Sequence, residues 1–246
     1  MFPIRDHNPS GRLPIVTILL IAINILVFLS YFPTNTENGI NQFIFDWGLI
    51  PARVMAGFGY ETILTSMFLH GGWMHLAGNM LFLWIFGDNL EDALGHVGFL
   101  LFYLASGIGA AAAQSVLDLQ SGIPMVGASG AIAGVLGGYL LLFPKARVDV
   151  LFIFIIIFRI FPIPAWIVLG LWLGLQIFSG VSTPSDAGGV AYWAHVGGFV
   201  TGLVLTVPVW LRRGAQAFWQ KTGGHPPNPE AEYRLGKSSV PRVPRR

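Results

Sequence analysis

Long apolar stretches dominate this chain and restrict it to folds that a lipid bilayer can accommodate. Six of them approach or reach the roughly 20 residues that a helix needs to cross the hydrocarbon core. They are residues 13–32, 65–86, 97–116, 126–143, 163–178 and 190–211. Because 54% of the residues are hydrophobic and only 11% are charged, an ordinary soluble domain is excluded. The sequence predicts an all-α, polytopic membrane protein with six transmembrane helices.

A seventh apolar run, residues 150–161, is better placed at the membrane interface. Its length, about 12 residues, is typical of interfacial or re-entrant segments, and Arg159 would cost roughly 2.5–3.5 kcal/mol at mid-bilayer. Short cytoplasmic flanks collect Lys and Arg. With six spans, all three basic clusters of the core flanks lie in the cytoplasm: Arg5 with Arg12, Lys145 with Arg147, and Arg212 with Arg213 and Lys221.

This topology divides the chain into a cytoplasmic segment, residues 1–12, a six-span core, residues 13–211, and a polar, proline-rich tail, residues 212–246, expected to be disordered in the cytoplasm. Residues 33–61 are expected to form a first outer loop lying in the interface, and residues 87–96 a cytoplasmic loop. The compact layout favours a bacterial plasma membrane. Nothing in the sequence specifies an oligomeric state.

Charge and cysteine content exclude two classes of function. The net charge is only +2 and the basic residues sit mostly near the ends, so nucleic-acid binding is not expected. The chain has no cysteine, so no thiolate nucleophile exists.

Polar residues inside spans are costly and require a partner or a function. In the six-span topology, the second, fourth and sixth spans run in the same direction, so their first turns share one depth near the outer surface. Three groups of residues lie there: His70, His75 and Asn79; Ser129; and His195. They define a candidate site.

Ser129 opens the fourth span within Gly127-Ala128-Ser129-Gly130. Unpaired N–H groups at a helix N-terminus can stabilise an oxyanion, which suits a nucleophile. A serine among small residues also commonly packs one membrane helix against another, so on this motif alone catalysis and packing are equally supported.

His195 is the candidate general base for Ser129, since histidine titrates near neutral pH. Small residues recur every four positions on both helices, at Gly130 and Gly134 and at Gly198 and Gly202, and such spacing lets two backbones approach closely. The alternative is a purely structural hydrogen bond between helices.

His75 and Asn79 are four residues apart and therefore share one helix face. Their side chains could donate to an oxyanion; alternatively they tie the second span to its neighbours. His70 is interpreted as structural. No His-Glu-x-x-His motif and no acidic residue within the predicted spans is present, so the sequence predicts neither a metal site nor a cofactor, and a Ser-His dyad rather than a triad.

These motifs resemble those of the rhomboid intramembrane serine proteases, whose pattern is His-x4-His-x3-Asn, then Gly-Ala-Ser-Gly, then Ala-His followed by glycines. The resemblance implies a six-helix rhomboid-like bundle with a water-filled cavity. In it Ser129 is the nucleophile, His195 is the base, and His75 and Asn79 bind the oxyanion, with Gly127, Gly130, Gly198 and Gly202 in support. It further implies a serine endopeptidase that needs no cofactor and cleaves transmembrane protein substrates within the lipid bilayer.

Two departures from the family pattern stand out. Ala133 occupies the position where some members have an aromatic residue that stacks on the histidine, so another side chain must orient His195. Glu61-Thr62 replaces a Trp-Arg pair of the first outer loop. Two other functions remain open: a non-catalytic rhomboid-like protein that binds transmembrane helices, and a small transporter or channel.

Overall fold

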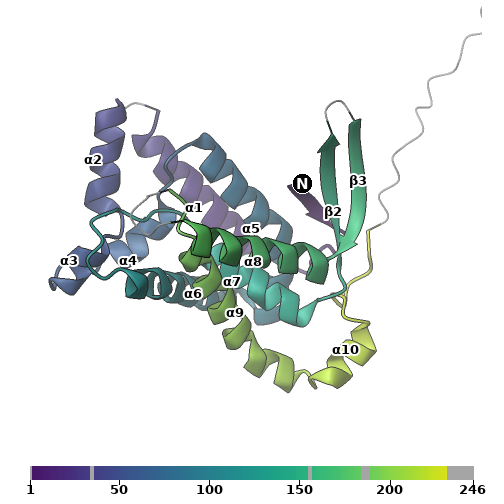
Figure 1. Cartoon of the computed structure of the whole chain (residues 1–246). Coiled ribbons are helices and arrows are strands. Elements are labelled where there is room, and N and C mark those ends of the chain that lie inside the picture. Colours follow the sequence, from purple (N-terminus) through teal and green to yellow (C-terminus); the bar gives the residue numbers. More distant parts are fainter. Residues whose placement is uncertain (1, 34–35, 155–156, 184–188, 232–246) are drawn as a thin grey trace, which may run out of the picture.

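The computed structural model describes residues 2–33, 36–154, 157–183 and 189–231, and it is mostly helical (Figure 1). Its longer helices correspond in order to the six apolar stretches of the sequence. They are α1 (Ile15–Tyr31), α5 (Trp73–Leu94), α6 (His96–Leu117), α7 (Ser129–Leu142), α8 (Ala165–Ser182) and α9 (Tyr192–Arg212).

Helix α7 lies at the centre of the bundle. Most of its residues are buried, and it packs against α5, α6, α8 and α9. Glycines make this possible: a β-carbon on Gly202 would lie 2.0 Å from the Gly134 carbonyl oxygen, and one on Gly134 would lie 2.3 Å from the β-carbon of Ser106. The close approach of α7 and α9 predicted from the glycine spacing is therefore confirmed.

Among the described residues, three helices are individually long and apolar enough to cross a membrane: α6, α8 and α9. Helices α1 and α7 are apolar but shorter, and α5 carries acidic residues in its last turns. The chain is thus a membrane protein with several apolar helices.

The segment between α1 and α5 folds into short helices: α2 (Glu37–Trp47), α3 (Pro51–Met55), α4 (Thr62–Thr65) and a 3-10 turn, η1 (Ser66–Phe68). The second apolar stretch was expected to be helical from residue 65, but α5 begins only at Trp73, so residues 65–72 belong to this segment instead. Leu49 and Met125 exchange two backbone hydrogen bonds that tie this loop to the segment before α7. The guanidinium of Arg53 lies 4.0 Å from the Phe45 ring centroid and donates to the Phe45 carbonyl. These contacts hold the loop where the family's Trp-Arg pair is absent.

The prediction of an all-α fold is wrong, because the chain also forms a three-stranded antiparallel sheet. Strand β2 (Arg147–Phe154) lies between β1 (Phe2–Asp6) and β3 (Ile157–Pro164). The described residues of the run 150–161 therefore lie in two paired antiparallel strands. Figure 1 places the sheet at the end of the bundle opposite α2, α3 and α4. A continuous apolar run carries no alternating pattern, so its sequence did not distinguish strand from interfacial segment.

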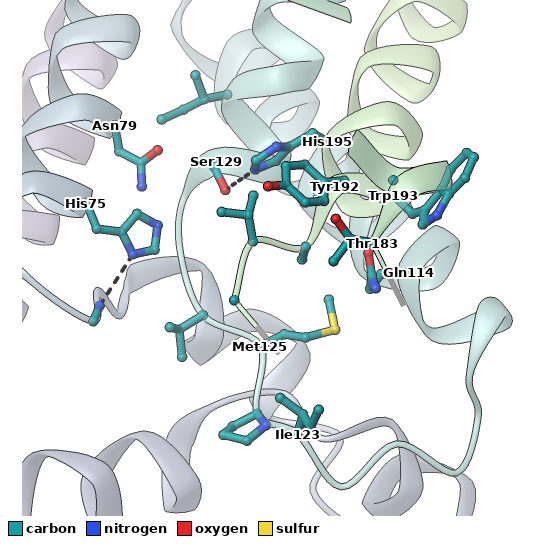
Figure 2. Close-up of a pocket in the computed structure, with 18 of the residues that line it drawn as sticks. His75, Asn79, Gln114, Ile123, Met125, Ser129, Thr183, Tyr192, Trp193 and His195 are labelled. Atoms are coloured by element: carbon teal, nitrogen blue, oxygen red, sulfur yellow. Dashed lines mark hydrogen bonds between the residues drawn. The ribbon is translucent and has the colours of Figure 1, made fainter. Parts of the chain in front are cut away.

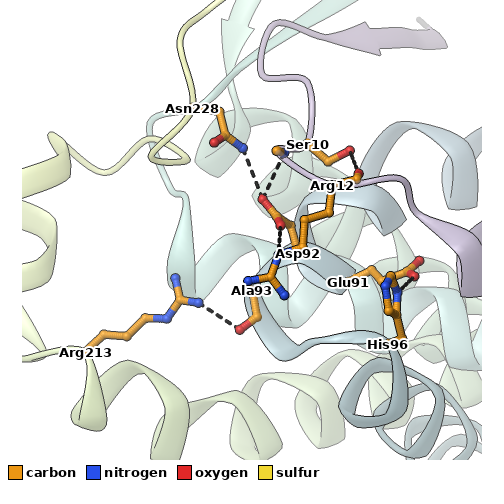
Figure 3. A network of polar contacts seen from close by, with 9 residues as sticks. Ser10, Arg12, Glu91, Asp92, Ala93, His96, Arg213 and Asn228 are labelled. Atoms are coloured by element: carbon orange, nitrogen blue, oxygen red, sulfur yellow. Dashed lines mark hydrogen bonds and ion pairs between the residues drawn. The ribbon is translucent and has the colours of Figure 1, made fainter.

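Residues 87–94, expected in a loop, continue α5 instead, and Gly95 alone separates α5 from α6. The acidic side chains there bind the N-terminal segment (Figure 3). Glu91, 2% exposed, accepts hydrogen bonds from the backbone N–H groups of Val16 and Thr17 and from the Thr17 hydroxyl. Glu91 thus supplies acceptors for N–H groups in the first turn of α1, where no side chain of the helix's own N-cap residue accepts a hydrogen bond.

The C-terminal segment is ordered further than expected. Helix α10 (Gln216–Thr222) follows α9, and its Phe218 is buried. Arg213 donates to the carbonyl of Ala93, and Asn228 donates to Asp92 (Figure 3). The rest of the expected disordered tail, residues 232–246, lies outside the described residues.

Candidate active site

The structure brings together the residues predicted from the second, fourth and sixth spans. Ser129 is the first residue of α7, His195 lies in the first turn of α9, and His75 and Asn79 lie in the first two turns of α5. All four line one cavity of about 900 Å³. Figure 2 shows His75 and Asn79 on one side of Ser129 and His195 on the other.

Ser129 and His195 are directly hydrogen-bonded. The Ser129 hydroxyl oxygen and Nε2 of His195 are 2.8 Å apart (Figure 2). When Ser129 donates its proton, Nε2 must be the unprotonated nitrogen of a neutral imidazole. This is the geometry that a serine nucleophile and its general base require.

Gly127 lets His75 approach Ser129. Its φ of +126° favours glycine, and a β-carbon there would lie 2.7 Å from Nε2 of His75 and 3.5 Å from the Ser129 hydroxyl. The backbone N–H of Gly127 donates to the Ser66 carbonyl, which fixes this turn. Any other residue at position 127 would push the imidazole away.

The His75 tautomer follows from its own contact. The Gly71 backbone N–H lies 3.4 Å from Nδ1 of His75, which makes Nδ1 the acceptor. The neutral ring then carries its proton on Nε2, the nitrogen that faces Gly127 and Ser129.

Asn79 presents a second donor. Its side chain is 7% exposed, and its amide nitrogen has no hydrogen-bond partner within the described residues. A buried amide without a partner is costly. Its position on the cavity wall makes it available to an acceptor that enters the cavity.

His70 lies behind this wall. It is fully buried, and its ring centroid is 5.0 Å from that of His75. The hydroxyl of Tyr31 donates to the His70 carbonyl at 2.6 Å and accepts from the His70 N–H at 2.7 Å. These backbone contacts position the turn before α5.

Two glutamines that the sequence analysis passed over contact the site. Nδ1 of His195 lies 2.7 Å from Oε1 of Gln176 in α8, and Oε1 of Gln114 in α6 accepts from the Ala194 N–H. Each lies inside an apolar stretch, so the cost of a polar residue in a span would have singled out both.

An aromatic ring does lie beside His195, but it belongs to α8. In some family members the ring comes from the position that corresponds to Ala133 of α7. Ala133 is buried in α7, and the ring centroid of Trp172 in α8 lies 5.7 Å from that of His195. Trp172 is one helical turn before Gln176, so both contacts come from one face of α8.

Fold and site together define a membrane-embedded helical bundle with a hydrogen-bonded serine-histidine pair in the wall of a cavity. Residues 58–212 match the Rhomboid domain. The chain belongs to the rhomboid family.

Named relatives come from several compartments and organisms. The chain is 30% identical over 198 residues to "Rhomboid protein 1, mitochondrial" of Saccharomyces cerevisiae, covering 71% of this chain and 54% of that protein. It is 34% identical to "RHOMBOID-like protein 4" of Arabidopsis thaliana, covering 67% and 38%, and 39% identical to "Rhomboid protease GluP" of Bacillus subtilis, covering 52% and 24%. The matches thus span about half or less of these relatives. Because they include yeast mitochondrial, plant and bacterial proteins, they do not support a bacterial membrane over an organelle membrane.

Proposed function

We propose that this chain is an intramembrane serine endopeptidase that hydrolyses peptide bonds of transmembrane proteins with Ser129 and His195. The observation that carries the proposal is the 2.8 Å hydrogen bond between these residues at the wall of a cavity. Family membership supports it, as does the resemblance to a named protease, GluP.

In the first step, the Ser129 hydroxyl oxygen attacks the scissile carbonyl carbon while Nε2 of His195 accepts the hydroxyl proton. The carbonyl oxygen becomes an oxyanion. His195, now an imidazolium, donates that proton to the leaving amine, and an acyl-enzyme on Ser129 remains. Water, deprotonated by His195, then hydrolyses the ester and restores the serine.

The oxyanion needs donors opposite the base. Nε2–H of His75 and the amide N–H of Asn79 face Ser129 from α5 (Figure 2), and the Ser129 backbone N–H is unpaired by its position as the first residue of a helix. In soluble serine proteases one such donor is worth about 3–4 kcal/mol of transition-state stabilisation.

Substrates must reach Ser129 in an extended conformation. A helix hides its carbonyl groups in internal hydrogen bonds, so a transmembrane substrate has to unwind before the serine can attack. The cavity of about 900 Å³ has room for several extended residues, and the polar side chains in its largely apolar wall can form hydrogen bonds with their backbone. We therefore place cleavage near the end of a substrate helix.

The proposed topology has six spans, α1 and α5 to α9, with the site near the outer surface and both termini in the cytoplasm. The sheet, α10 and the basic residues around them then lie together on the cytoplasmic side.

Proteoliposomes that contain this protein and a purified single-span substrate test the activity. Wild type should release two fragments, and Ser129→Ala should release none while eluting as the same monodisperse peak. If folded wild type left every member of a panel of single-span substrates intact, binding of transmembrane helices without cleavage would be the better account.

A further inference from the structure

Gln176 is the one amide side chain on the largely apolar helix α8, and within the described part of the chain its side chain hydrogen-bonds to the proposed base. Helix α8 lies at the periphery, with only Ala165 and Leu169 buried. Oε1 of Gln176 nevertheless reaches inward to 2.7 Å from Nδ1 of His195. If Gln176 faced the lipid, its amide would have no hydrogen-bond partner and would be costly in the bilayer. The contact with His195 avoids this cost.

The hydrogen bonds at the two ring nitrogens of His195 depend on the same tautomer. Nε2 can accept the Ser129 proton only when the ring proton is on Nδ1, and a proton on Nδ1 needs an acceptor. Gln176 Oε1 is that acceptor at 2.7 Å, while Ser129 lies at 2.8 Å on the other side of the ring. Serine, histidine and glutamine thus form one line across α7, α9 and α8.

We infer that Gln176 is a positioning residue, which fixes His195 in the tautomer and orientation that lets Nε2 accept the serine proton. This inference rests on the proposed function. In soluble triads an ionised carboxylate does this and also stabilises the imidazolium. A neutral amide supplies the acceptor without placing a second charge in the bilayer, where a carboxylate is costly.

Trp172 completes the positioning from the same helix. Its ring lies beside the imidazole, with centroids 5.7 Å apart, and beside Phe199, at 6.3 Å. The indole limits rotation of the ring out of the line between Ser129 and Gln176. The amide selects the tautomer, and the indole limits the tilt.

Two substitutions separate positioning from packing. Gln176→Met keeps the side-chain length and removes the acceptor, and Gln176→Glu keeps the acceptor and adds a charge. Leu175→Met is the matched control, because Leu175 is the neighbouring residue of α8 and is 62% exposed. The readouts are kcat and KM for a reconstituted single-span substrate between pH 5 and 9, together with the rate of fluorophosphonate labelling.

Gln176→Met should lower kcat and the labelling rate roughly 10- to 100-fold and leave KM within about twofold of wild type. The expected loss in kcat is smaller than the roughly 10⁴-fold loss seen when the carboxylate of a soluble triad is replaced by an amide. Gln176→Glu should have a kcat close to that of wild type at alkaline pH, because the acceptor for Nδ1 is kept. Its acid limb should lie about one pH unit higher than in wild type, because a carboxylate favours the protonated imidazole and so raises the pKa of His195. Leu175→Met should match wild type.

Active wild type with an unchanged kcat in Gln176→Met would overturn the inference and leave the proposed function standing. If Gln176→Met does not fold, the Gln176→Glu variant tests the inference instead. A pH–rate profile whose acid limb lies at the same pH as that of wild type would then overturn it. Folded wild type that neither cleaves nor labels would remove the proposed function, and the inference with it.

Discussion

Gly198 of α9 lies against the backbone of Gly130 of α7, so that a β-carbon at position 198 would be 2.0 Å from the Gly130 carbonyl oxygen. Because the obstacle is backbone, no side-chain rotation can relieve the clash. Gly198→Val should therefore separate α7 from α9 and abolish cleavage although it alters neither Ser129 nor His195. Overpacking a core costs typically 1–3 kcal/mol, and we expect a loss of thermal stability as well.

Gly174→Ala is the matched control for that experiment. Gly174 lies in α8, and a β-carbon there would meet no atom within 4 Å. This variant should keep full activity and gain up to about 1 kcal/mol from helix propensity. Wild-type cleavage in Gly198→Val would contradict the account of how the two helices meet.

Asp6 makes the stability of the protein depend on pH. One oxygen of its carboxyl group accepts hydrogen bonds from Asn89 and Tyr139. Burial, and then the nearby carboxylate of Asp88, raise its pKa to about 8. The folded chain thus keeps a proton that the unfolded chain releases near pH 4. The stability due to this group is complete below about pH 4 and lost as the pH rises through about 8.

Asp6→Asn removes the titration and keeps an oxygen that can accept from both partners. The melting temperature of the variant in detergent should exceed that of wild type by a margin that grows from about pH 4 to about pH 8 and then stays constant. Parallel melting curves at all pH values would show that Asp6 is ionised in the folded protein.

Asp149 should behave in the opposite way. Burial raises the pKa of its carboxyl, but hydrogen bonds from His7 and Arg5 outweigh this and hold the pKa below its usual value. Its contribution is therefore present above about pH 4 and lost as the pH falls further. Asp149→Asn should lower the melting temperature at pH 7 and change it little near pH 3.

Glu91 supplies the acceptors for the first turn of α1. Glu91→Ala leaves the buried Thr17 N–H and hydroxyl without an acceptor and should cost on the order of 3 kcal/mol. Glu37→Ala, at an exposed position in α2, should change the stability by less than about 0.5 kcal/mol. Chemical denaturation in mixed micelles compares the two, and equal stabilities would refute the role of Glu91.

The natural absence of cysteine allows a direct test of the topology. Single cysteines at the exposed positions Asn38 and Gln120 should react with a membrane-impermeant maleimide from one side of oriented vesicles, and those at Arg159 and Lys221 only from the other. Six spans require this partition. Arg159 and Gln120 labelled from the same side would exclude it.

The apolar stretches predicted the long helices, except that the second helix lies further along the chain than expected, and the motifs singled out Ser129, His195, His75 and Asn79, which line one cavity in the structure. The prediction succeeded because apolar length and glycine spacing are properties of local sequence. The sheet was missed because β1 and β2 lie far apart in the chain and residues 150–161 lack alternation. The end of α5 was missed because its acidic side chains bind the N-terminal segment, a contact made only on folding.

Gln176 was missed for a different reason. The sequence contained the signal, a lone amide within an apolar stretch, but nothing in the family pattern pointed to it. Its role depends on the relative rotation of α8 and α9, which only the three-dimensional arrangement provides.

The most direct test of the central claim is labelling of the detergent-solubilised protein with a fluorophosphonate probe, with the modified residue identified by mass spectrometry. The account predicts one adduct on Ser129 in wild type and none in either Ser129→Ala or His195→Ala, with all three proteins equally folded. Folded wild type that does not react, or His195→Ala that reacts as fast as wild type, would contradict it.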